Sequence, residues 1–333
     1  MALTVKWDSG ILIESGGERI IFDPRRHGRD CSHIFVTHAH LDHSRGLRFH
    51  DVEKSSTRET GEIASRYSRL TRWRPLSYGE RVEVGGLEVE AHNAGHVLGS
   101  ALYEVSTSDG RLLYTGDMQF RDTLTMKAAE PVDCDILVIE ATFGSPFFKF
   151  PERGEIARDM VEWAFKTMRD GKIPTFRTDS LGNAQEIVKA FNMLTNLPVV
   201  VHRRIAEINQ IYEDHGISLE FLISGSEEAK EVEASGECVF IIPKNLRVGD
   251  PRFKVALASG WSLLYGRRRG DSFPLSDHAD FNQLIEFIEA CKPKVVLTCF
   301  GGRFNRILAQ QVEKRMSIEA RPLDLIPTVF IRG

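Results

Sequence analysis

T-H-A-H-L-D-H-S-R-G, residues Thr37 to Gly46, places four metal-binding side chains within a six-residue run. These are His38, His40, Asp42 and His43, in the spacing H-x-H-x-D-H. Because the chain holds only 11 histidines among 333 residues, chance rarely produces such a run. Neutral imidazole and carboxylate suit Zn²⁺, and a catalytic zinc keeps one position open for water. The run therefore predicts metal-assisted hydrolysis, with surface histidines that bind no metal as the alternative.

Two later stretches carry further ligand types on loops. The apolar run Ile34 to Val36 predicts a buried strand directly before the first motif, and loops that leave such strands often carry functional groups. Asn93 to Ala101 read N-A-G-H-V-L-G-S-A, with His96 between glycines that permit close backbone approach. Tyr114 to Met118 read Y-T-G-D-M, with Asp117 after a predicted strand. Taken alone, such a histidine is more often structural and such an aspartate more often marks a turn.

The bulk composition shows no global bias towards nucleic acid. The chain is 42% hydrophobic and 27% charged with a formal net charge of −4, which allows a large core and two domains. Its five cysteines include no C-x-x-C pair, so we expect reduced thiols and no thiolate zinc site. Met1 to Ile13 lack the features of a signal or transit peptide, and no apolar run approaches the roughly 20 residues of a membrane span. We therefore expect a soluble cytoplasmic protein without a membrane partner.

The first half of the chain, to about Gly144, is predicted to be rich in strands, because short apolar runs alternate there with Gly, Asp and Asn. The predicted strands are Ile11 to Ile13, Arg19 to Phe22, Ile34 to Val36, Leu87 to Glu90, Ala101 to Val105, Leu112 to Tyr114 and Ile136 to Ile139.

After Pro146 the pattern changes to helices that alternate with strands, which predicts a small parallel α/β unit. Its elements are helices over 151–170 and from Ala184 to Leu194, strands at Ile173 to Phe176, Val199 to Val201 and Val239 to Ile242, and a loop or short helix over Gly225 to Gly236. A helix from Phe281 and a strand at Val295 to Leu297 then resume the first architecture, so the middle is predicted to be an insertion.

The order of these motifs resembles that of known metal-dependent hydrolases. The H-x-H-x-D-H run followed by His96 and Asp117 resembles the metal-binding motifs of the metallo-β-lactamase fold, and Asp23, at the end of a predicted strand, resembles its first motif. I-E-A-T-F-G resembles motif A of the β-CASP nucleases, with Glu140 as the acidic residue. S-D-H-A-D-F resembles their motif B, with His278 as the histidine.

The resemblance implies an α/β protein with an inserted domain. The αββα sandwich of the metallo-β-lactamase fold would occupy residues 1–148 and 271–333, and a small α/β β-CASP domain would occupy residues 149–270. E-A-T-F-G-S-P-F-F and S-L-G-N-A-Q are most similar to the bacterial ligase-associated DNA exonuclease group. That group implies a single-strand-preferring DNA exonuclease of DNA repair, with a DNA ligase as a possible partner.

Two cues about the substrate conflict. Where motif C of the family has a histidine before glycine, this chain has Phe300, or Cys299 if the alignment shifts by one residue, and an apolar residue there is typical of DNA-acting members. Glu140, in contrast, is typical of RNA-acting members, so an RNA-processing ribonuclease, exo or endo, is the alternative. A thiol or lactone hydrolase, or an inactive metal-binding scaffold, is a weaker alternative, because neither needs an insertion with motif B.

The resemblance also implies a role for each site residue. The first metal would be held by His38, His40 and His96, with Asp117 bridging to a second metal held by Asp42 and His43; we expect one or two Zn²⁺ ions, with Mn²⁺ as a substitute. A metal-activated water would attack phosphorus, and Asp42 would also orient it. His278 would protonate the leaving oxygen, positioned by Glu140. The alternative for His278 is a histidine that caps a helix or lies in the core. The alternative for Glu140 is a buried carboxylate that accepts hydrogen bonds from backbone amides.

Substrate contacts are predicted at a turn and at basic clusters. Ser180, Gly182 and Asn183 lie between a predicted strand and a predicted helix, where free N–H groups would bind a substrate phosphate; a simple helix cap is the alternative. Clusters of arginine would bind the nucleic-acid strand, with exposed side chains that only contact solvent as the alternative. They are Arg66, Arg69, Arg72 and Arg74 with Tyr67 and Trp73; Arg203 and Arg204; and Arg267, Arg268 and Arg269.

Overall fold

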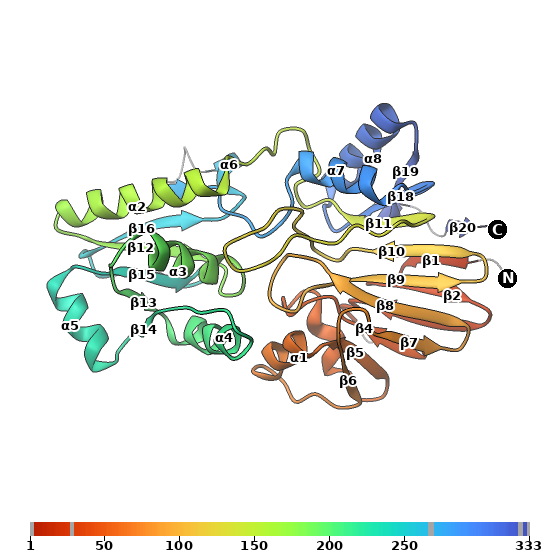
Figure 1. Ribbon diagram of the computed structural model, residues 1–333, viewed down its shortest axis with the longest axis horizontal. Coiled ribbons are helices and arrows are strands. Elements are labelled where there is room, and N and C mark those ends of the chain that lie inside the picture. Colours follow the sequence, from red (N-terminus) through yellow and green to blue (C-terminus); the bar gives the residue numbers. More distant parts are fainter. Residues whose placement is uncertain (1–2, 27–29, 266–269, 326–328, 332–333) are drawn as a thin grey trace. The chain divides into compact units, whose positions relative to one another are not determined.

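The computed structural model describes residues 3–26, 30–265, 270–325 and 329–331. The chain divides into two compact units (Figure 1). Unit 1 comprises Met1–Asp122, Lys127–Lys149 and His278–Gly333, and unit 2 comprises Thr123–Met126 and Phe150–Asp277. Among the described residues, no helix is long and apolar enough to cross a membrane.

The first sheet of unit 1 has the strand order β20-β1-β2-β3-β4-β5-β6. Its strands are β1 Leu3–Trp7, β2 Ile11–Ser15, β3 Glu18–Phe22, β4 His33–Phe35, β5 Glu53–Thr57, β6 Trp73–Leu76 and β20 Val329–Ile331. The strands from β20 to β3 pair antiparallel, and those from β3 to β6 pair parallel. The first and last strands of the chain therefore lie side by side.

The second sheet has the order β19-β18-β11-β10-β9-β8-β7. Its strands are β7 Arg81–Val84, β8 Leu87–Asn93, β9 Ala101–Thr107, β10 Gly110–Tyr114, β11 Ile136–Glu140, β18 Val295–Cys299 and β19 Glu319–Pro322. Every strand predicted in the first half overlaps an observed one. The predicted strand at Val295 to Leu297 is confirmed as β18, which pairs with β11 and so joins the C-terminal part to the first half.

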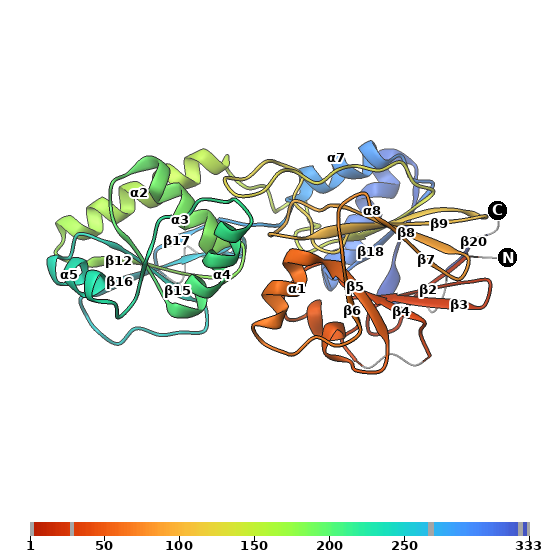
Figure 2. The same ribbon diagram turned by 60° about the horizontal axis from the view of Figure 1, so that its bottom comes forward.

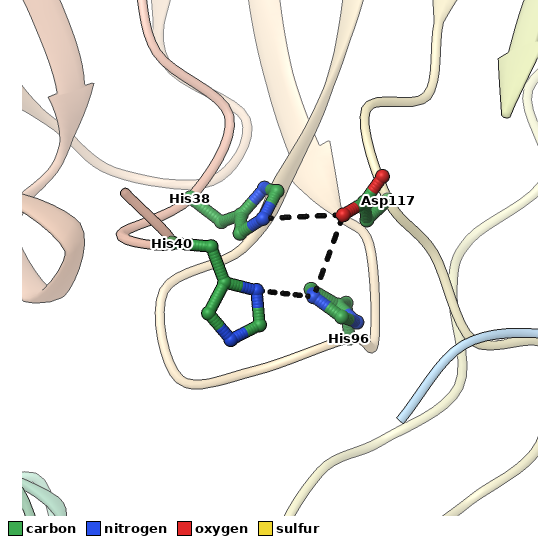
Figure 3. A group of neighbouring side chains, drawn as sticks. All are labelled: His38, His40, His96 and Asp117. Carbon is green, nitrogen blue, oxygen red and sulfur yellow. Dashed lines mark hydrogen bonds and ion pairs between the residues drawn. The ribbon is translucent and has the colours of Figure 1, made fainter. Parts of the chain in front are cut away.

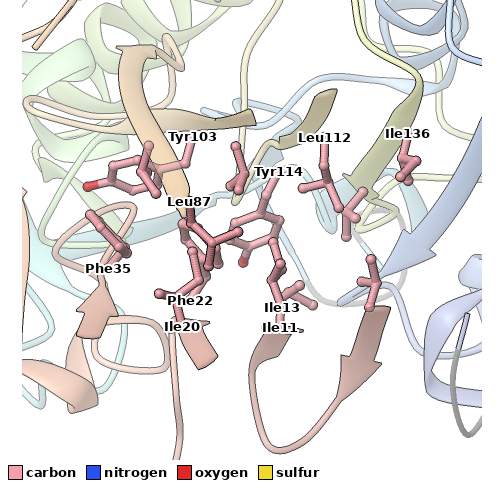
Figure 4. Close-up of a cluster of buried hydrophobic side chains, with 14 of the residues drawn as sticks. Ile11, Ile13, Ile20, Phe22, Phe35, Leu87, Tyr103, Leu112, Tyr114 and Ile136 are labelled. Carbon is pink, nitrogen blue, oxygen red and sulfur yellow. The ribbon is translucent and has the colours of Figure 1, made fainter. Parts of the chain in front are cut away.

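The core of unit 1 lies between these sheets (Figure 4). Ile11 and Ile13 of β2 face Tyr103 and Tyr114 of the second sheet, whereas Leu12 points to the opposite face, as the period of two residues in a strand requires. Because both faces of β2 are covered, all three side chains are buried. Helices must therefore cover the outer faces.

Helices do cover both outer faces of the sandwich (Figure 2). The second sheet is covered by α7 (Phe281–Cys291) and α8 (Arg303–Met316), with Leu284 and Leu308 packed against its side chains. The first sheet is covered by the short 3-10 helix η1 (Ser44–Arg48), through Leu47, and by α1 (Arg58–Ser65), through Ala64. A further 3-10 helix, η3, spans Leu323–Leu325. Unit 1 is thus the αββα sandwich of the metallo-β-lactamase fold.

Unit 2 is a small parallel α/β unit, as the alternating pattern predicts, and forms the β-CASP insertion. Its sheet has the order β14-β13-β15-β12-β16-β17, and every observed pair is parallel. The strands are β12 Ile173–Thr178, β13 Val199–Val201, β14 Leu222–Ile223, β15 Val239–Pro243, β16 Phe253–Ala258 and β17 Ser272–Phe273. The helices are α2 Arg153–Arg169, α3 Asn183–Leu194, α4 Arg203–Asp214, α5 Glu227–Ser235 and α6 Ser262–Tyr265. The segment left open between loop and short helix is therefore helical, as α5.

Candidate metal centre

A buried carboxylate organises the loop that carries the H-x-H-x-D-H run. Asp23 follows β3 and is fully buried, and its Oδ1 accepts a hydrogen bond of 2.8 Å from the backbone N–H of Thr37. Its Oδ2 accepts hydrogen bonds of 2.7 Å from the hydroxyls of Thr37 and Tyr114. His43 Nδ1 lies 2.8 Å from the same oxygen. Asp23 therefore ties the ends of β3, β4 and β10 to one ring of the run.

Three histidines and one aspartate converge at the end of these strands (Figure 3). One ligand atom of each of His38, His40, His96 and Asp117 lies within 4.8 Å of the others. His38 Nε2 is 3.4 Å from Asp117 Oδ2, and His96 Nε2 is 3.0 Å from His40 Nδ1. The loop of His96 is held by Ser100, whose Oγ accepts a 3.0 Å hydrogen bond from the His96 N–H. The group is therefore positioned from three separate loops.

The protonation states of this group suit a divalent metal. His38 is fully buried, and its Nε2 faces Asp117 Oδ2 at 3.4 Å. Burial lowers the pKa of His38 to about 4, and burial followed by the charge of His278 holds the pKa of His96 well below its ordinary value. Burial opposes ionisation of Asp117, but His43 and His278 outweigh it and keep its pKa well below its usual range. Neutral imidazoles beside a carboxylate form a donor set that zinc and similar cations prefer.

Asp42 and His43 lie beside the same carboxylate of Asp117. His43 Nε2 is 3.4 Å from Asp117 Oδ2 and 3.8 Å from Asp42 Oδ2. Burial opposes protonation of His43, but the carboxylates of Asp117 and Asp23 outweigh it and raise its pKa to about 9. The Asp42 side chain is 62% exposed and its Oδ2 lies 3.6 Å from Nη2 of Arg25. This side of the centre is therefore more open than the group of three histidines.

Phe300, and not Cys299, occupies the position beside His43. The two rings are 4.6 Å apart and inclined by 32°. Trp7 also packs against Phe300, with its ring 5.2 Å from that of Phe300. Cys299 is fully buried, and its Sγ lies 3.4 Å from the carbonyl oxygen of Ile139. The residue at motif C thus presents an aromatic face to His43 and no ligand atom.

His278 and Glu140 form a pair at the same centre. His278 Nδ1 lies 3.1 Å from both carboxylate oxygens of Glu140, and His278 Nε2 lies 3.9 Å from Asp117 Oδ2. Glu140 is fully buried at the end of β11, and its Oε1 also accepts a 2.8 Å hydrogen bond from the N–H of Met118. The cap of α7 is Asp280, which accepts from the N–H of Gln283. His278 is therefore directed towards Asp117 and is not the helix cap.

Some residues that hold the centre in place carry no signal in the sequence. Gln119 donates from Nε2 to the carbonyl oxygen of His278, at 2.9 Å. Tyr114, for which the sequence predicts only a place in a strand, donates from its hydroxyl to Asp23. Both contacts join residues far apart in the sequence, so local patterns do not indicate them.

The turn Ser180 to Asn183 lies in unit 2, at the start of α3. Gly182 is the N-cap at φ +90°, where a side chain would be strained, and its N–H donates to Gln185 Oε1 at 2.8 Å. Gln185 Nε2 donates in turn to the carbonyl oxygen of Ser180 at 3.0 Å. Asn183 Oδ1 is buried and has no partner among the described residues. The turn therefore has its own cap, and phosphate binding by Ser180, Gly182 and Asn183 stays a prediction.

Several arginines of the three clusters form ion pairs with nearby glutamates. Arg74 Nη2 lies 2.7 Å from Glu80 Oε1, Arg72 lies 3.9 Å from Glu53, and Arg203 lies 3.8 Å from Glu207 on the same helix. The run Arg267 to Arg269 lies outside the described residues. Binding of a nucleic-acid strand by these clusters stays a prediction.

Comparisons with known proteins identify a family model and relatives that are similar to this chain. A family model described as "Beta-lactamase superfamily domain" matches residues 11–175. A "Probable DNA ligase" of Opitutus terrae is 28% identical over 291 residues, which cover 84% of this chain and 28% of that protein. The chain therefore spans little more than a quarter of that relative's length.

Two further similarities extend over nearly the whole chain. An "RNase J-like protein" of Methanocaldococcus jannaschii is 23% identical over 361 residues, which cover 86% of this chain and 85% of that protein. A crystal structure of a protein of unknown function from Enterococcus faecalis V583 superimposes with a TM-score of 0.67 at 15% identity, and covers 99% of this chain and all of that one. At this level of identity the structural similarity shows the fold alone.

Proposed function

Since the chain belongs to the β-CASP family of the metallo-β-lactamase superfamily, we propose that it is a metal-dependent nuclease that hydrolyses phosphodiester bonds. The observation that carries the proposal is the pairing of two features at one centre. A donor set for a divalent metal faces His278, a histidine held by the buried carboxylate of Glu140. Hydrolysis of a phosphodiester needs both charge stabilisation and a proton for the leaving oxygen.

The metal would be held by His38, His40, His96 and Asp117, with Asp42 and His43 on the open side, and we propose Zn²⁺ with Mn²⁺ as a substitute. When bound, the ion would act as a Lewis acid towards a phosphoryl oxygen and activate water. Asp23 holds the imidazole of His43 through Nδ1, which directs Nε2 towards the centre.

Proton transfer in the proposed reaction belongs to His278. Its Nδ1 faces Glu140, so an N–H at Nδ1 donates a hydrogen bond to that carboxylate. Nε2 is then the ring nitrogen that faces the substrate. Glu140 accepts hydrogen bonds from backbone N–H groups as well, which fixes its orientation. Glu140 is therefore proposed as the residue that positions His278, and His278 as the one that protonates the leaving oxygen.

For the substrate we propose single-stranded DNA degraded from an end, in DNA repair and with a DNA ligase as a partner. The similarity to a protein named as a probable DNA ligase and the aromatic residue Phe300 at motif C support this choice. RNA processing is the second candidate, supported by Glu140 in motif A and by the similarity to a protein named RNase J-like.

One assay separates the candidates. Single-stranded DNA and RNA of one sequence, each blocked at the 5′ or the 3′ end, are incubated with the protein and Zn²⁺ or Mn²⁺, with a His38→Ala variant as the control. We expect faster hydrolysis of DNA from its free end and no hydrolysis by the variant. Rapid cleavage of RNA with inert DNA would replace the DNA proposal by the RNA one. Hydrolysis of neither, by protein shown to contain metal, would exclude the nuclease function.

A further inference from the structure

A basic cavity lies beside the candidate metal centre on unit 1. Its volume is about 320 Å³, and its wall is formed by Arg25, Leu41, Arg45, Arg48 and Phe49. Three guanidinium groups thus face one hollow together with an aliphatic and an aromatic side chain. Of these residues, Arg25 contacts Asp42 of the metal centre.

Short chain segments connect this wall to the metal-binding residues. Leu41 lies between His40 and Asp42, and η1, which carries Arg45 and Arg48, has His43 as its N-cap. The N–H groups of His43 and Ser44 donate to the carbonyl oxygen of His40, at 3.0 and 2.9 Å. The cavity is therefore held in a fixed place next to the centre.

The other side of the wall is equally well anchored. Arg25 Nη2 lies 3.6 Å from Asp42 Oδ2, and its guanidinium stacks 5.2 Å from the centre of the Phe300 ring. A Cβ on Gly46 would come within 2.9 Å of Pro24 and Ile34, so η1 packs closely on the segment that carries Arg25. The wall is therefore a packed structure that presents its guanidinium groups at defined positions.

Two of the three charges of this wall have no ion-pair partner among the described residues. Arg45 and Arg48 are exposed and form no ion pair or hydrogen bond with the side chains of the described residues. Arg25 Nε is buried without a hydrogen-bond partner among those residues. Guanidinium groups bind phosphate oxygens in a bidentate manner and stack on planar rings. Phe49 is half-buried at the edge of the same cavity, where a base could stack on it.

We propose that this cavity is a subsite that binds one nucleotide of a single strand next to the scissile phosphodiester. The arginines would bind its phosphate group, and Phe49 with Leu41 would contact its base. The identity of the ligand as a nucleic-acid strand rests on the proposed function. The cavity would then hold the strand in register with the metal centre, because both are built on one stretch of chain, from His38 to Phe49.

Binding of a fluorescein-labelled twelve-residue thymidine strand tests the proposal. The measurement uses fluorescence anisotropy of the full chain in chelator, which prevents hydrolysis. Arg45→Glu and Arg48→Glu should each raise Kd about tenfold, and the double variant should lower the slope of log K against log salt by about 0.7 per lost phosphate contact. The control is Arg306→Glu, an exposed residue of α8 on the other outer face of the sandwich, which should change Kd far less.

The role of the base is tested separately from that of the phosphate. Phe49→Leu keeps an apolar side chain in the wall but removes the aromatic face. We expect it to weaken binding of the thymidine strand and to leave binding of an abasic strand of the same length unchanged. Equal loss for both strands would show that Phe49 acts only on folding, and would refute base stacking in the cavity.

The outcomes also separate this proposal from the proposed function. If the wild-type protein hydrolyses nucleic acid but Arg45→Glu and Arg48→Glu bind the strand no more weakly than Arg306→Glu, the subsite is refuted while the nuclease stands. If the wild-type protein binds the strand through these arginines but hydrolyses neither DNA nor RNA, the nuclease proposal fails and the subsite stands. Binding of inorganic phosphate that is lost in Arg45→Glu and Arg48→Glu, together with an unchanged Kd of the thymidine strand in both variants, would show that free phosphate is the ligand and would overturn the strand assignment.

Discussion

At the scale of single residues, the centre depends on contacts that hold each imidazole in one orientation. His43 is held by Asp23, and His278 is held by Glu140. In both pairs, a buried carboxylate faces Nδ1 of the ring, so Nε2 is the atom turned to the centre. Substitution of a ring and substitution of its carboxylate should therefore have different effects.

Substitution of His278 should reduce catalysis and leave metal binding unchanged. We expect His278→Ala to lower turnover about 10²–10⁴-fold, because a positioned acid contributes that much, while elemental analysis shows the same metal content. Glu140→Gln keeps the shape of the partner and should cause a smaller loss together with a shifted pH profile. Near-normal turnover of His278→Ala would remove this histidine from the mechanism.

Phe300 should limit occupancy of the open side of the centre. It stands 4.6 Å from His43 with φ of +59°, a conformation that histidine tolerates better than most residues. We expect the wild-type protein to keep between one and two zinc ions per chain, with the second easily removed by chelator, and Phe300→His to keep nearly two. Two tightly held ions in the wild-type protein would contradict this view of motif C.

His33, whose Nε2 lies 2.9 Å from the hydroxyl of Ser55, should make stability fall in acid. Burial, followed by the charges of Arg74 and Lys54, lowers its pKa to about 4 from an ordinary 6.5. Between those pH values the unfolded chain binds a proton that the folded chain does not, so this stability is present above pH 6.5 and is lost as the pH falls to about 4.

The measurement is urea unfolding of metal-free protein at pH 7 and pH 5. The loss of unfolding free energy on acidification should be about 1–2 kcal/mol smaller in His33→Gln than in the wild-type protein. An equal loss in both proteins would show that His33 titrates normally.

At the scale of elements, unit 2 includes the short segment Thr123–Met126, which interrupts the sequence of unit 1. Glu186 of α3 accepts hydrogen bonds from the N–H of Leu124, at 3.0 Å, and from the hydroxyl of Thr125, at 3.2 Å. It also pairs with Arg153 of α2 at 3.2 Å, and Arg153 donates to the carbonyl oxygen of Ser276 at 2.7 Å. Glu186 thus joins the segment Thr123–Met126 and both ends of the insertion.

Removal of this carboxylate should destabilise unit 2. Because Glu186 is buried and its partners would lose their acceptor, we expect Glu186→Ala to lower the unfolding free energy by about 2–4 kcal/mol in urea denaturation. Glu162→Ala, at an exposed position of α2, is the matched control and should change it by less than about 0.5 kcal/mol. Equal stability of the two variants would mean that the contacts of Glu186 are replaced by water.

At the scale of the whole molecule, both sheets of the sandwich contribute to the metal centre. Strands β3 and β4 belong to the first sheet, whereas β8, β10 and β11 belong to the second. A bound metal would therefore connect the two layers, and its binding free energy would add to the stability of unit 1.

Removal of metal should lower the melting temperature. A metal present at 100 times its Kd stabilises the folded state by about 2.7 kcal/mol, so calorimetry should show a lower Tm after treatment with chelator and recovery after addition of Zn²⁺. His38→Ala, which lacks one ligand, should show a much smaller shift. A wild-type Tm that is independent of metal would show that the site is empty under these conditions.

The sequence alone predicted the helices α2, α3 and α7, many strands of the sandwich and a candidate ligand set for the centre, because these depend on local patterns. Short continuous apolar runs, such as Ile11 to Ile13 of β2, predict strands that are buried on both faces. The sequence did not predict helices α4 and α8. Their exposed faces are rich in charged and polar residues, so the apolar positions of these helices do not stand out as one face. Strand β5, with the sequence E-K-S-S-T, lacks apolar side chains and is stabilised by pairing between β4 and β6.

The tertiary structure alone decided how residues distant in the sequence combine. It showed that Phe300, and not Cys299, contacts His43, because the turn after β18 directs one side chain to the centre and the other into the core. It showed that Tyr114 and Gln119 support the centre, and it brought Arg25 beside Arg45 and Arg48. Ligand chemistry is a property of residue type and local spacing, whereas the partners of a buried group depend on which strands become neighbours in a sheet.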